Sequence, residues 1–145
     1  MARRSIRKSK WAIIPASIFV LVWGIGGSYF FAREAYDYYV ADDCRAELSA
    51  AITEGVNANS AVNTDDPKLA AQGYADTARA FAEAVAAIKC PTTIAPVQDD
   101  LVKALYAYVA VQEKQATTGA TIDERAYATE RVGDALRALT ALGVE

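Results

Sequence analysis

The feature that most constrains this chain is an uncharged stretch near its start, Trp11 to Phe31, which reads WAIIPASIFVLVWGIGGSYFF. It contains 21 residues and no Asp, Glu, Lys or Arg. An α-helix rises 1.5 Å per residue, so this stretch covers about 31 Å, close to the hydrocarbon thickness of a bilayer. The sequence therefore predicts a transmembrane helix over residues 11–32, which leaves enough chain for one small domain.

A cleaved signal peptide is the main alternative to a retained anchor. Signal peptides have a shorter apolar region, of roughly 7–15 residues, followed by small residues at the cleavage site. Here bulky aromatic and charged residues occupy the exit of the apolar stretch, at Tyr29–Phe31 and Arg33–Glu34. We therefore expect the helix to be retained as a single-pass anchor.

Charge is distributed unevenly about this stretch. Five of the 15 basic residues lie in residues 1–10, and the other ten accompany all 18 acidic residues, so residues 11–145 carry a net charge of −8. The positive-inside rule predicts a cytoplasmic tail over residues 1–10 and an extracytoplasmic domain over residues 33–145, in the cell membrane. The acidic domain argues against nucleic acid as a partner. The high alanine content is typical of high-GC bacteria.

Small side chains recur every four residues along the predicted anchor. Such stripes let membrane helices approach closely, which indicates packing against another integral membrane protein or a second copy of this chain. The alternative is that Gly and Ala are simply common in membrane helices. The predicted packing positions are Ala12, Ala16, Gly24 and Ser28.

The remaining chain has helical periodicity and no alternating strand pattern. We expect the anchor to continue as a helix from Ala32 to about Gly55, followed by a loop over residues 57–64. Further helices are predicted to start at Pro67, Pro96 and Thr121, because each position carries a helix-start signal. The predicted fold is all-α, an antiparallel four-helix bundle. Its alanine-rich inner faces predict close packing without a roomy central cavity.

The two cysteines, Cys44 and Cys90, both fall in the predicted extracytoplasmic domain. Oxidising compartments favour pairing, so we expect a disulfide between the first and second helices of the bundle, with two free buried thiols as the alternative. One difficulty concerns register. If the first helix ended near Asn57, Cys90 would lie about 13 Å further along the bundle than Cys44. A longer first helix, a climbing loop or a reversal near Pro91 would each remove this mismatch.

Catalysis is not expected. The sequence contains no histidine, which removes the commonest general base and metal ligand. Three adjacent carboxylate pairs occur, but neighbouring helical residues point in different directions, and helix capping or a solvated surface explains them. The pairs are Asp42–Asp43, Asp65–Asp66 and Asp99–Asp100. No metal, cofactor or enzymatic activity is predicted.

Tyr36, Tyr38 and Tyr39 follow the predicted anchor and suit either interfacial anchoring or contact with a protein partner.

The leading interpretation is an accessory subunit whose extracytoplasmic bundle binds and stabilises a larger envelope membrane protein complex. A sensory or ligand-binding bundle is a second interpretation. A third is an exclusion or immunity protein that acts on a membrane partner. We also expect the anchor helix to contact the lipids of the bilayer.

Overall fold

The computed structural model describes the backbone from Ile14 onward and side chains from Tyr36 onward. The predicted tail over residues 1–10 lies outside this part of the chain. So do the side chains of the predicted transmembrane segment, residues 11–32, including Ala12, Ala16, Gly24 and Ser28. Among the residues that the structure describes, no helix is long and apolar enough to cross a membrane.

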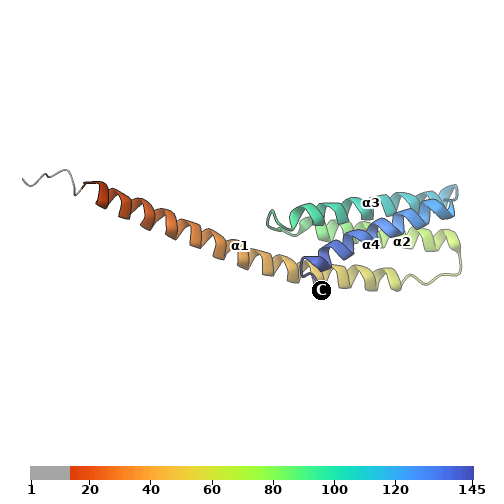
Figure 1. Ribbon diagram of the computed structural model, residues 1–145. Helices are drawn as coiled ribbons and strands as arrows, with labels where there is room; N and C mark the ends of the chain where they lie inside the picture. The colour runs from red at the N-terminus through yellow and green to blue at the C-terminus, as the bar shows by residue number, and fades with distance from the viewer. Residues whose placement is uncertain (1–13) are drawn as a thin grey trace, which may run out of the picture. The chain divides into compact units, whose positions relative to one another are not determined.

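Four α-helices make up the described chain, and no strand occurs from Ile14 to Glu145 (Figure 1). The predicted all-α class is confirmed, and the arrangement is consistent with a four-helix bundle. The chain divides into two units at Tyr38 and Tyr39, and the fold described below concerns the second unit, residues 39–145. The helices are α1 (Ile14–Ser60), α2 (Pro67–Ala87), α3 (Ala95–Thr117) and α4 (Ile122–Ala141).

Two of the predicted helix starts are built from local caps. Asp66 caps α2, because its Oδ1 accepts a hydrogen bond of 2.8 Å from the Lys68 amide, and Pro67 occupies the first helical position. Thr121 and Glu124 form a capping box at α4, in which each side chain accepts from the other residue's backbone amide. These sequence signals therefore act as predicted.

The start of α3 has a different basis. The helix begins at Ala95, one residue before the predicted start, and Ile94 makes no side-chain cap. A turn precedes it, in which the Ile94 amide donates to the Pro91 carbonyl at 2.9 Å. Ile94 itself is 1% exposed, so burial of its side chain holds the turn in place.

The predicted end of the first helix is wrong. α1 continues past Gly55 and through Asn57 to Ser60, so the first part of the predicted loop is helical. The reason is tertiary packing. A Cβ built on Gly55 would lie 2.5 Å from Cγ of Phe81 in α2, so this glycine permits close helix approach and does not end the helix.

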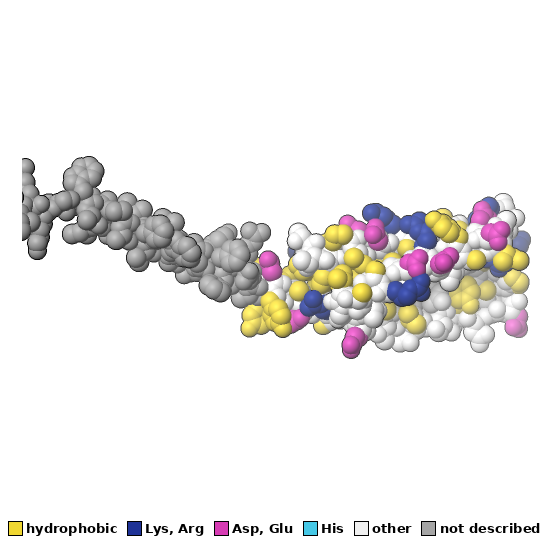
Figure 2. All heavy atoms as spheres, viewed as in Figure 1, with side chains coloured by type: hydrophobic (Ala, Val, Ile, Leu, Met, Phe, Trp, Pro, Cys, Tyr) yellow, Lys and Arg dark blue, Asp and Glu magenta, His cyan; other side chains and the backbone are white. Residues whose placement is uncertain are grey.

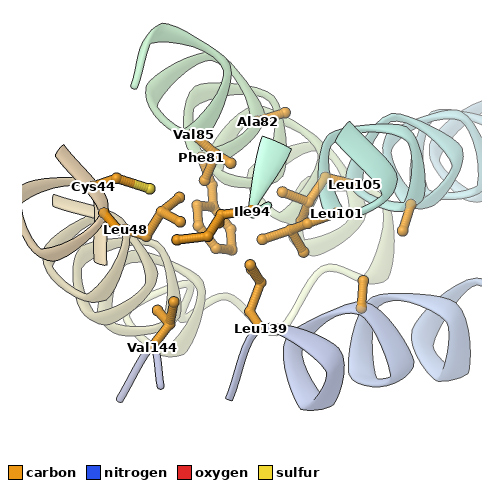
Figure 3. Packing of buried hydrophobic residues seen from close by; sticks show 13 residues of the cluster. Cys44, Leu48, Phe81, Ala82, Val85, Ile94, Leu101, Leu105, Leu139 and Val144 are labelled. Carbon is orange, nitrogen blue, oxygen red and sulfur yellow. The ribbon is translucent and has the colours of Figure 1, made fainter. Parts of the chain in front are cut away.

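The core of the bundle lies where α1, α2, α3 and α4 meet (Figure 3). Leu48, Val85, Leu101 and Leu139 contribute one large side chain from each helix, and each is fully buried. Burying an aliphatic side chain of this size stabilises a fold by roughly 1.5–3 kcal/mol. This cluster therefore sets how the four helices pack.

Leu69, in the first turn of α2, is exposed although its side chain is apolar. Leu69 is 55% exposed, whereas Ala71 and Ala75 are buried. Gly55 of α1 faces Phe81 of α2, and the two helices run antiparallel. Leu69 precedes Phe81 by twelve residues, so a residue facing it on α1 would have to lie twelve residues after Gly55, near position 67. α1 has already ended at Ser60, which leaves Leu69 without a facing helix.

Candidate functional site

The sulfur atoms of Cys44 and Cys90 lie at disulfide distance, with the two Cα atoms 5.2 Å apart. The register difficulty is resolved in two ways. α1 continues for three residues beyond Asn57, which adds about 4.5 Å to the length of the helix. The loop then climbs along the bundle, because Val62 packs against Gly73, the seventh residue of α2, about 9 Å from its start. The bridge joins α1 to the connection between α2 and α3.

The three carboxylate pairs lie apart and serve local structure. Asp42 forms an ion pair with Arg45 at 2.9 Å, and Asp66 caps α2. Asp100 lies 3.5 Å from Lys103. Asp99 and Asp100 fall in the second turn of α3, because the helix starts at Ala95. Among the described residues, no group of His, Cys, Asp or Glu is placed to hold a metal ion.

The predicted partner-contact tyrosines are accessible. Tyr36, Tyr38 and Tyr39 have exposed fractions of 69%, 64% and 69%. Elsewhere on the bundle, acidic and basic side chains are interspersed on the face shown in Figure 2. A surface of mixed charge does not favour a strongly charged partner, whereas exposed tyrosines offer large contact area with a polar tip.

A pocket of about 190 Å³ lies at the C-terminal end of α1, inside the bundle unit. All four helices contribute to it. Gly55 and Ser60 come from α1, Phe81 from α2, Leu105 from α3 and Val132 from α4. Every lining side chain is uncharged. The alanine-rich inner faces predicted no roomy central cavity, and no sequence pattern indicated this pocket at the end of α1.

Tyr108 is the most polar aromatic group of the pocket. Burial raises the pKa of its hydroxyl, and this effect outweighs a hydrogen bond with Gln112, which acts in the opposite direction. The hydroxyl therefore stays protonated at neutral pH. Gln112 is itself buried, so this pair forms a satisfied polar contact beside the pocket.

Comparison with known proteins gives no relative from which a function could be transferred. No protein-family model, curated protein or solved structure matches this chain.

Proposed function

We propose that this chain is a single-pass membrane accessory subunit, whose extracytoplasmic helical bundle binds and stabilises a larger envelope membrane protein complex. The observation that carries the proposal is the uncharged stretch from Trp11 to Phe31, preceded by five basic residues. Its length suits a bilayer, and the charge difference sets its orientation. α1 has bounds of Ile14 and Ser60, so helical backbone extends from this stretch into the bundle.

Two sets of residues are proposed to contact the partner. The small-residue stripe of Ala12, Ala16, Gly24 and Ser28 would pack against a helix of the partner within the membrane. Tyr36, Tyr38 and Tyr39 would contact it outside the membrane, and their exposure supports this role. The disulfide also supports an extracytoplasmic bundle, because such bonds persist in oxidising compartments.

Membrane topology is tested by cysteine labelling of the full chain in intact cells. Two variants, S5C and T118C, place one new thiol on each side of the predicted membrane; Thr118 is exposed at the end of α3. A membrane-impermeant maleimide should label T118C in intact spheroplasts and S5C only after permeabilisation. Labelling of S5C before permeabilisation would contradict the predicted orientation. Extraction of the protein by alkaline carbonate would contradict the membrane anchor.

Partner binding is tested by site-specific photo-crosslinking followed by purification in mild detergent. A photoreactive amino acid at position 24 or 36 should give an adduct with another membrane protein. The same group at Tyr106 or Tyr127, which are also exposed, should give none and serves as the matched control. Recovery of the chain alone contradicts the proposal, and an adduct with a second copy identifies a homo-oligomer instead. The identity of the partner separates an accessory role from an exclusion role.

A further inference from the structure

We propose that the bundle binds a small, uncharged molecule of single-ring size, carrying one hydrogen-bond donor, in the pocket at the C-terminal end of α1. This goes beyond the partner binding proposed above. It rests only on residues 55–136 and requires neither the anchor nor the tyrosines near it.

Size sets the class of ligand. The pocket has a volume of about 190 Å³. An apolar protein cavity of about 150 Å³ holds a benzene molecule, so this pocket has room for one ring with one or two added heavy atoms. Val56, Ser60 and Thr129 line it and are exposed, so they form a mouth through which a ligand can enter from solvent.

The inner wall favours an apolar ring. Phe81 and Leu105 line the pocket and also belong to the buried core (Figure 3). Leu136 extends this wall on α4. An aromatic ligand gains both area burial and edge or offset contacts with the Phe81 ring. A charged ligand would lose hydration here with no opposite charge in the lining to compensate.

Four polar side chains line the pocket, those of Asn59, Ser60, Tyr108 and Thr129, and the two aliphatic hydroxyls at its mouth can accept a hydrogen bond from a ligand. The Ser60 hydroxyl donates to the Val56 carbonyl at 2.9 Å, and the Thr129 hydroxyl donates to the Arg125 carbonyl at 2.9 Å. Each hydroxyl has thus used its only hydrogen and keeps an oxygen that accepts. A phenolic hydroxyl on the ligand supplies the matching donor.

Small residues keep the pocket from being filled by the protein itself. Ala78 lines it from α2 and leaves the space that a larger side chain would occupy. Gly55 lets the Phe81 ring rest directly on the backbone of α1, so the ring is held against α1 and not turned into the cavity. The pocket is therefore a preformed feature of this packing.

The test uses the full chain in lipid nanodiscs, with p-cresol as the probe. Thermal unfolding is followed by circular dichroism at increasing p-cresol concentration, because a ligand that binds only the folded state raises the unfolding midpoint. The midpoint should rise with p-cresol, rise less with toluene, which lacks the hydroxyl, and stay unchanged with benzoate, which is charged. No rise at any p-cresol concentration up to its solubility limit overturns the proposal.

Two variants separate binding in the pocket from partition into lipid. Ala78→Leu fills the pocket and should weaken p-cresol binding at least tenfold, whereas Ala86→Leu, on an exposed position of the same helix, should bind as the unmodified chain does. Equal midpoint shifts in both variants overturn the proposal. If Ala78→Leu does not fold, Thr129→Phe covers the mouth from an exposed position, with Glu130→Phe as its control, and the same comparison decides.

Discussion

At the scale of single residues, two helical glycines behave in opposite ways. A Cβ on Gly55 would meet the Phe81 ring at 2.5 to 2.7 Å, whereas a Cβ on Gly133 would meet only the flexible end of Arg137 at 3.5 Å. We expect Gly55→Ala to destabilise the bundle by about 1–3 kcal/mol through overpacking. Gly133→Ala should stabilise it by up to about 1 kcal/mol, because alanine is the better helix former. Urea denaturation of both variants measures this, and equal signs would contradict the packing of α1 against α2.

A second residue, Gln98, ties the end of α2 to α3. Its side-chain amide nitrogen donates to the Val85 carbonyl at 2.6 Å and to the Ile88 carbonyl at 2.8 Å. These carbonyls lie at the C-terminal end of α2, where helix carbonyls lack intrahelical partners. Gln98→Leu should cost about 1–3 kcal/mol, because the Ile88 carbonyl loses its donor and the Val85 carbonyl keeps only the Ile88 amide, at 3.2 Å. Gln72→Leu, at an exposed position of α2, is the control, and a similar loss of stability in both variants would contradict this role of Gln98.

At the scale of elements, the disulfide connects α1 to the segment that follows α2. The loop closed by Cys44 and Cys90 spans 46 positions, and the chain-entropy relation gives a stabilisation of about 4 kcal/mol for a loop of that length. We expect Cys44→Ala/Cys90→Ala to lower the free energy of unfolding by about 2–4 kcal/mol. Mass spectrometry of the alkylated, non-reduced protein checks the bond directly. Alkylation of both thiols would exclude it.

The capping box of α4 should make the stability of the fold depend on pH. A hydrogen bond from Lys114 and one from the Thr121 amide lower the pKa of Glu124 below its ordinary value of 4.5. A carboxylate with a lowered folded-state pKa contributes stability above its unfolded-state pKa and loses that contribution as the pH falls through the folded-state value.

Glu124→Gln should therefore lower the urea midpoint at pH 7, and its difference from the unmodified chain should shrink as the pH is lowered below 4.5, the ordinary pKa of the group. Glu130→Gln, whose side chain makes no hydrogen bond or ion pair within the described residues, should leave the midpoint unchanged throughout this pH range. A difference for Glu124→Gln that does not shrink as the pH is lowered below 4.5 would contradict the assignment.

The same elements show how far the sequence can be read. The starts of α2 and α4 follow from Asp66, Pro67 and Thr121, because a cap is a local interaction between residues a few positions apart. The end of α1 does not follow from the sequence, because Gly55 ends a helix in isolation and extends one when Phe81 packs over it. The pairing of Cys44 with Cys90 could be predicted from the cysteine count and the expected compartment. Its register could not, because it depends on where Val62 packs along α2.

The pocket had no sequence signal. It is lined by the last turns of α1 together with residues of α2, α3 and α4 that lie far apart in the sequence. Each lining residue taken alone is typical of a helix core or surface. Ala78, for example, is indistinguishable by pattern from Ala82, which is fully buried. Only the packing of four helices separates the two.

At the scale of the whole molecule, the division at Tyr38 and Tyr39 predicts an independent folding unit. Residues 39–145, secreted into an oxidising compartment, should be helical by circular dichroism and unfold in one cooperative transition, because they contain the core cluster and the disulfide. A gradual transition would show that the preceding residues are required for folding.

The position of the disulfide also determines how the bundle responds to mechanical load. Cys44 lies five residues after Tyr39, and its bond leads directly to the segment between α2 and α3. Tension arriving along α1 at Tyr39 therefore meets a covalent link before it reaches Leu48 and the apolar contacts beyond. The sulfur–sulfur bond carries the pull into the rest of the fold, and α1 cannot be peeled away from its neighbours one turn at a time.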